Sequence, residues 1–135
     1  MATFKSFEDI QAWQKARLLC IKINELITTT ELAKDYKLKD QINGSSGSIM
    51  DNIAEGFGRG GNPEFVQFLE FSHGSACECQ SQLYRILDRQ YITKELFDEL
   101  FFLCSEIRKM IIGLIHYIQQ ANIKGPKFKN RQPNN

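Results

Sequence analysis

Glu70 and His73 have the Glu-x-x-His spacing that helical di-iron proteins use, because residues three apart lie on one face of a helix. A di-iron site needs this motif twice, together with two further glutamates. The other histidine of the chain, His116, follows Gly113 at that spacing and not a carboxylate. Half of such a site is therefore missing, and a metal-binding bundle is only a remote alternative.

The four cysteines offer a second kind of chemistry. Cys77 lies four residues after His73, but Cys79 is about 200° around a helix of 3.6 residues per turn from Cys77. One helix cannot gather all three side chains as zinc ligands. Cys20 and Cys104, like the other two, lie inside apolar-periodic segments, where reduced cysteine behaves as a small buried hydrophobe. No recognised nucleophile motif surrounds them, so we predict no enzyme, no catalytic residue and no cofactor.

The glycine-rich run from Gly56 to Gly61 resembles a phosphate-binding loop only superficially. It joins two predicted helices instead of following a strand, and no Gly-Lys-Ser/Thr sequence comes after it. We expect these glycines to end one helix in left-handed conformations and to turn the chain.

Asn52, Glu55 and Arg59 share a stripe on the helix before this turn, and Glu55 and Arg59 have the i,i+4 order that favours an ion pair. Two interpretations remain open. The pair could be ordinary surface pairing, or Glu55 could bridge helices or subunits, with its charge satisfied by Arg59 or by backbone amides near the turn.

Apolar residues at steps of three and four predict four helices. Short loops between them favour an all-α fold, an antiparallel up-down-up-down four-helix bundle. Ser6 with Asp9 is expected to cap the first helix, Asn62 the third and Thr93 the fourth. The apolar seam of the first helix is predicted at Ile10, Trp13, Ala16, Cys20, Ile23 and Ile27, and that of the last at Leu96, Leu100, Leu103, Ile107, Met110, Leu114 and Tyr117.

The second helix, about residues 36–57, contains the run Asn43-Gly44-Ser45-Ser46-Gly47-Ser48, which in isolation would indicate a turn. Ile42, Ile49 and Ile53 keep a helical phase across it, so we predict a continuous helix. When this helix folds back on the next, the small residues 44–48 face residues 72–77. The glycines are therefore expected to permit a close helix–helix approach.

The chain of 135 residues has a formal net charge of +1 and no apolar run long enough to span a bilayer. One bundle is expected over residues 1–123, where 16 acidic residues outnumber 13 basic ones. Residues 124–135 form a basic tail that we expect to be disordered. With no signal-peptide pattern at the start, a cytoplasmic location is expected. The tail residues that could contact phosphates or stack on a base are Lys124, Lys127, Phe128, Lys129 and Arg131.

The run Asn52-Ile53-Ala54-Glu55-Gly56, with Gln41-Ile42 before it and Phe68-Leu69 after it, resembles the signature of the S23-type four-helix-bundle family. That family is encoded by intervening sequences in bacterial 23S ribosomal RNA genes, and the resemblance covers roughly residues 6–120. Many members carry paired arginines where this chain has Asn43 and Gly44. The resemblance implies homopentamers, and a related branch comprises retroelement accessory variability proteins that bind reverse transcriptase and nucleic acid.

Together these observations favour a non-enzymatic, oligomeric interaction scaffold. The broad apolar arcs of the first and last helices, which include Leu18, Ile21 and Phe101, support homo-oligomerisation independently of the resemblance. The alternative is an RNA-binding adaptor for an RNA-handling enzyme such as a reverse transcriptase. The basic tail supports this alternative, whereas the acidic excess of the body argues against it.

Overall fold

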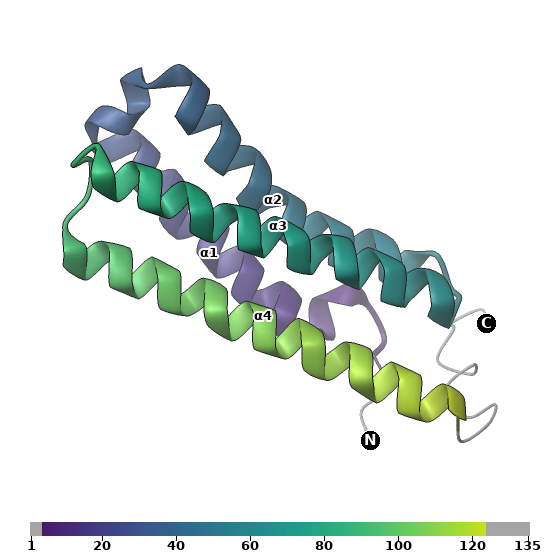
Figure 1. The fold of residues 1–135 in the computed structure, drawn as a ribbon. Coiled ribbons are helices and arrows are strands. Elements are labelled where there is room, and N and C mark those ends of the chain that lie inside the picture. The colour runs from purple at the N-terminus through teal and green to yellow at the C-terminus, as the bar shows by residue number, and fades with distance from the viewer. Residues whose placement is uncertain (1–3, 124–135) are drawn as a thin grey trace.

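Consecutive helices run in opposite directions in the computed structural model, which describes residues 4–123 (Figure 1). This is the predicted all-α, four-helix bundle. A 3₁₀ turn, η1, precedes the first helix, and a second, η2, joins α1 to α2. The elements are η1 (Phe7–Asp9), α1 (Gln11–Thr29), η2 (Glu31–Lys34), α2 (Tyr36–Gly58), α3 (Asn62–Asp88) and α4 (Lys94–Ile123).

The first helix begins later than predicted. Ser6 and Asp9 form the expected capping box, but it caps η1 and not the long helix. Ile10 then adopts an extended backbone (φ −80°, ψ 119°), and α1 begins at Gln11. The side chain of Ile10 is 1% exposed, so this break places an apolar residue in the core.

This break also changes which face of α1 is buried. The predicted seam is partly wrong, because Trp13, Cys20 and Ile27 are only half-buried. Trp13 instead packs edge-on against Phe7 of η1, with ring centroids 5.0 Å apart. In α4 the buried stripe is likewise rotated toward α3, so Leu96, Met110 and Leu114 are half-buried. The buried residues of α1 are Ala12, Ala16, Leu19, Ile23 and Leu26, and those of α4 include Phe97, Leu100, Cys104, Ile107 and Ile111.

The second helix is continuous through its glycine- and serine-rich run, as predicted. Serines, however, make the contacts with α3: Ser45 Oγ donates to Gln82 Oε1 (2.6 Å), and Ser72 Oγ donates to the carbonyl of Ile49 (2.7 Å). A methyl group at Gly44 or Gly47 would meet nothing within 4 Å. The expectation that these two glycines permit a close approach is therefore wrong.

The turn between α2 and α3 uses glycine for its backbone freedom at one point, Gly60, whose φ is 88°. Gly61 is the N-cap of α3, in an extended conformation. The predicted N-cap, Asn62, is instead the first helical residue and is buried. Thr93 caps α4 as predicted, since its Oγ1 accepts from the backbone N–H of Leu96 (3.1 Å).

Candidate functional site

The helix turn that precedes the α2–α3 hairpin carries the signature residues. Asn52 Nδ2 donates to both the carbonyl and the hydroxyl of Ser48, each at 2.8 Å. Glu55 Oε2 lies 2.8 Å from a guanidinium nitrogen of Arg59, and both side chains are about half exposed (54%). The ion pair therefore joins the last turn of α2 to its C-cap residue, on the solvent side of the helix. A bridging role of Glu55 between subunits stays a prediction.

Gly56 has a steric role that its place in a glycine-rich run does not reveal. It lies inside α2 and is buried, so the prediction that it ends the helix is wrong. A Cβ at this position would lie 2.6 Å from Cβ of Phe68 and 3.2 Å from the ring of Phe65. Only a hydrogen atom fits, so Gly56 marks the place where α3 packs directly on the α2 backbone.

Aromatic side chains of α3 extend this site to the surface. The guanidinium of Arg59 lies 5.1 Å from the ring centroid of Phe68, and Phe68 packs edge-on against Phe71 (5.6 Å). Phe71 is 51% exposed. The spacing of these two phenylalanines was visible in the sequence, but the position of Arg59 over Phe68 required the hairpin geometry. An exposed aromatic ring beside an ion pair is suited to contact with another molecule.

A polar network joins α3 to α4 around His73. Arg108 Nε donates to His73 Nε2 (3.2 Å), and a second Arg108 nitrogen donates to Gln80 Oε1 (2.9 Å). The amide of Gln80 in turn donates to Ser105 Oγ (2.9 Å) and to the carbonyl of Phe101 (3.2 Å). Together, these bonds link the middle of α3 to α4 across their interface.

The environment of His73 favours its neutral form. Burial, and then the positive charge of Arg108, lower its pKa below the usual value. Because Nε2 accepts a hydrogen bond, the proton of the neutral ring is on Nδ1, which lies 3.9 Å from Cys77 Sγ. Both ring nitrogens thus have protein partners.

Glu70 and His73, the pair with metal-ligand spacing, line a surface cavity of about 240 Å³ together with Ile112, Ile115 and His116. The bundle thus brings the two histidines to one cavity, which their separation in sequence did not reveal. Over residues 4–123, however, no three His, Cys, Asp or Glu side chains are arranged to hold a metal ion.

The cysteines lie in or near the core as free thiols. Cys79 and Cys104 are fully buried, and the pKa of Cys104 is raised by its hydrogen bond with the thiol of Cys79 and by burial. Cys20 Sγ donates to the carbonyl of Ser46 (3.3 Å), and burial raises its pKa as well. Protonated, enclosed thiols are poor nucleophiles and poor metal ligands.

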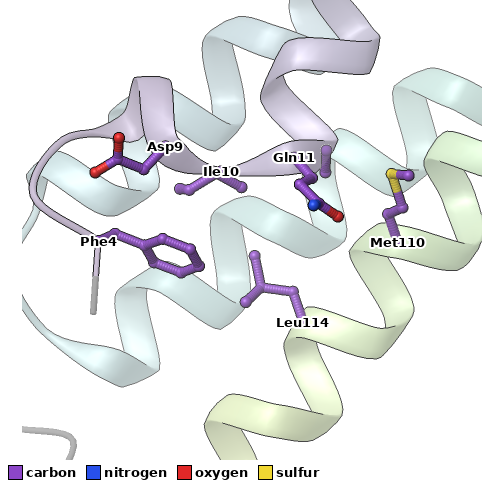
Figure 2. Close-up of a pocket in the computed structure, with 7 residues that line it drawn as sticks. Phe4, Asp9, Ile10, Gln11, Met110 and Leu114 are labelled. Atoms are coloured by element: carbon purple, nitrogen blue, oxygen red, sulfur yellow. The ribbon is translucent and has the colours of Figure 1, made fainter. Parts of the chain in front are cut away.

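A larger cavity, of about 430 Å³, lies between the N-terminal segment and the second half of α4 (Figure 2). Ala12 also lines it. Figure 2 shows the ring of Phe4 and the side chain of Leu114 on either side of the space below Ile10. Its lining is mainly apolar, with polar groups contributed by Asp9 and Gln11. No pair of an acid and a base, or of a nucleophile and a base, lines it.

The outer face of α1 and α4, which we call the α1/α4 face, exposes three large apolar side chains. Leu18 is 38% exposed, Ile21 50% and Phe102 63%. Two ion pairs cross between the helices on this side: Lys15–Glu106 (3.8 Å) and Lys22–Glu99 (2.8 Å).

The signature lies within a region of the chain that matches a known protein family. The family model for 23S rRNA-intervening sequence proteins matches residues 8–113, which span the hairpin and all four helices. The chain belongs to this family. No curated protein matches the sequence.

The fold of this family member is similar to a crystal structure, at 1.70 Å resolution, of a protein with unknown function from the S23 ribosomal protein family of Bacteroides thetaiotaomicron VPI-5482. The TM-score is 0.71 and the sequence identity 25%. The similarity covers 78% of this chain and 95% of the other.

Asn43 and Gly44, where the resemblance leads one to expect paired arginines, are exposed on α2. Neither residue brings a charge to that surface. The tail residues predicted to contact nucleic acid, 124–131, lie outside the described residues. Within residues 4–123, none of the helices has the length and apolar character that crossing a membrane would require.

Proposed function

We propose that this member of the 23S rRNA-intervening sequence protein family is a non-enzymatic scaffold that acts in the cytoplasm. In this proposal it self-associates and presents its remaining surface to partner molecules. The observation that carries the proposal is the α1/α4 face. Leu18, Ile21 and Phe102 gather there, and exposed apolar groups that cluster on one side of a protein mark interaction surfaces.

The side chains that could take part in catalysis or metal binding are instead placed to support the structure. His73 is held between Arg108 and Cys77, and the buried thiols face the core. At the signature, Gly56 sets the packing of α2 on α3, while Glu55, Arg59 and Phe71 form a surface suited to contact. Tight packing between helices together with exposed contact surfaces is what a scaffold protein needs.

Light scattering coupled to size exclusion tests this proposal on the full-length protein over a hundredfold range of concentration. We expect one discrete species larger than a single chain, with a mass that changes little between low and physiological salt because apolar contacts are not screened. The family resemblance implies five copies, so the mass expected is five times that of one chain. A single-chain mass at every concentration would overturn the proposal.

A second candidate is an RNA adaptor for an RNA-handling enzyme such as a reverse transcriptase. Its support is the charge of residues 124–135, which hold four basic residues and no acidic one. Titration of a structured RNA with the full chain, and with a variant ending at Ile123, tests this role. Binding that weakens steeply with salt and is lost on truncation supports it. Equal binding by both forms, or none by either, contradicts it.

A further inference from the structure

We propose that Cys77 is a site of reversible modification by small-molecule disulfides, and that the ring N–H of His73 assists the reaction. Three side chains in contact support this proposal. Cys77 Sγ lies 3.9 Å from His73 Nδ1, and His73 Nε2 accepts a hydrogen bond from Arg108 (3.2 Å). All three belong to α3 and α4 of one chain, so the proposal does not depend on self-association.

The four thiols of the chain differ in their access to reagents. Cys79 and Cys104 are fully buried, so a reagent reaches them only when the bundle opens. Cys20 is partly exposed, but its S–H donates to the carbonyl of Ser46 (3.3 Å), and burial raises its pKa. Cys77 is also partly exposed, and the neighbour of its sulfur is a ring nitrogen instead of a carbonyl oxygen.

The bond from Arg108 sets the direction of the contact between His73 and Cys77. Because His73 Nε2 accepts from the guanidinium, the neutral ring carries its proton on Nδ1 and presents this N–H to the sulfur. A thiolate formed at Cys77 can accept the same bond, and bonds to a charged acceptor are stronger than those to a neutral one. A Cys20 thiolate would instead face the carbonyl oxygen of Ser46.

A fixed positive charge lies behind the histidine. Arg108 is held from two sides on α3, by His73 and by Gln80 Oε1 (2.9 Å). Gln80 is itself buried and donates to Ser105 Oγ of α4 (2.9 Å). The guanidinium is therefore kept beside the pair of His73 and Cys77, and nearby cationic groups favour negative charge on sulfur.

The reaction we propose is thiol–disulfide exchange. The thiol of Cys77 first loses its proton to water, and the thiolate then attacks one sulfur of a small disulfide such as oxidised glutathione. A new S–S bond to Cys77 forms, the S–S bond of the reagent breaks, and the other half of the reagent leaves as a thiolate that takes up a proton. The reagent is thus reduced as Cys77 is oxidised, and an added thiol reverses the exchange.

Incubation of the native full-length protein with oxidised glutathione at about pH 7.5 tests the site, with peptide mass spectrometry to locate the adduct. We expect one adduct per chain, on Cys77, that dithiothreitol removes. Cys77→Ser should stay unmodified over the same time. Cys20→Ser, the matched control at the other partly exposed thiol, should react as fast as the wild type. Modification of Cys20 before Cys77, or of all four thiols at one rate, overturns the site.

Replacements of His73 test the assisting N–H group. His73→Leu removes the donor, so modification of Cys77 should become at least about threefold slower, since a hydrogen bond to a charged group is lost. His73→Gln supplies an amide that can both accept from Arg108 and donate to sulfur, and it should retain most of the rate. His116→Gln, at the exposed histidine, is the control and should react like the wild type.

Circular dichroism checks that each variant keeps its helices, and His73→Met replaces His73→Leu if that protein does not fold. The location of the adduct in the wild type needs no variant. A rate for His73→Leu equal to that of the wild type overturns the role of the N–H group. A rate for His73→Gln as low as that of His73→Leu overturns it too, because the loss then reflects disturbed packing and not a missing donor.

Discussion

At the scale of single residues, the positions of the glycines in α2 show how one atom controls helix packing. Gly56 has the Cβ of Phe68 where its own methyl group would be, whereas Gly44 faces open space. Both residues carry the same entropic cost of a glycine in a helix. They should therefore respond oppositely to the same substitution.

We predict that Gly56→Ala lowers the free energy of unfolding by about 1–3 kcal/mol, because the added methyl group overpacks the contact with Phe68. Gly44→Ala should raise it by about 0.5–1 kcal/mol, since only helix propensity changes there. Urea unfolding at one fixed protein concentration measures both. A Gly56→Ala protein as stable as Gly44→Ala would show that α2 and α3 can separate at no cost.

Burial of His73, and then the positive charge of Arg108, make the stability contributed by this histidine depend on pH. The pKa of His73 is lowered in the folded protein by burial and by Arg108, so the unfolded chain takes up the proton first as the pH falls. This contribution is complete above about pH 6.5, the pKa of an unperturbed histidine, and it decreases as the pH falls from there toward the lowered pKa.

We predict that His73→Gln flattens the pH dependence of stability below about pH 6.5, because glutamine keeps an acceptor for Arg108 but does not take up a proton. Thermal unfolding from pH 7.5 to pH 5 measures the difference from wild type. His116→Gln removes the other, exposed histidine and serves as the control. If stability depended on pH equally in the wild type and in His73→Gln, proton uptake by His73 would not be the cause of that dependence.

At the scale of elements, the helical spacing of apolar residues predicted the secondary structure better than local composition did. Ile42, Ile49 and Ile53 identified α2 as continuous through a run that resembles a turn, and the structure confirms this. Periodicity did not reveal the rotation of α1, because that depends on the break at Ile10 and on the packing of Trp13 against Phe7. These are tertiary contacts, which a helical pattern does not encode.

In the candidate site, contacts within one helix could likewise be predicted from the sequence, and contacts between helices could not. The Glu55–Arg59 ion pair could be predicted because four residues make one helical turn. The bond between His73 and Arg108 could not, since 35 residues and a loop separate them. The steric role of Gly56 was hidden for the same reason, because the neighbour that excludes a methyl group is on α3.

Between α2 and α3, the buried bond from Ser45 to Gln82 should stabilise the pair of helices. Ser45→Ala is predicted to cost about 1–3 kcal/mol, because it removes the donor to a buried amide oxygen. The double variant Ser45→Ala/Gln82→Met should recover much of that loss, since both partners are then apolar. Denaturant unfolding of the single and double variants gives the coupling. Additive losses would mean that the hydroxyl and the amide act independently.

At the scale of the whole molecule, the apolar side chains divide into two groups. The core consists of fully buried residues from all four helices. Phe102, which is 63% exposed, is not part of it. A side chain so exposed contributes little to the stability of one chain. Its stabilising effect is expected only when a second copy covers it, and that effect must then depend on concentration.

The melting temperature of the wild-type protein is therefore predicted to rise with protein concentration, because association stabilises the folded state by mass action. Phe102→Asp should abolish this rise while its melting temperature matches that of the wild type at the lowest concentration. Tyr36→Asp should keep the rise, since Tyr36 is as exposed (68%) but is the first residue of α2 and lies on neither α1 nor α4. Differential scanning calorimetry over a hundredfold concentration range measures all three proteins. A wild-type melting temperature that is constant over that range, or a rise that Phe102→Asp retains, would show that the α1/α4 face takes no part in stabilising an assembly.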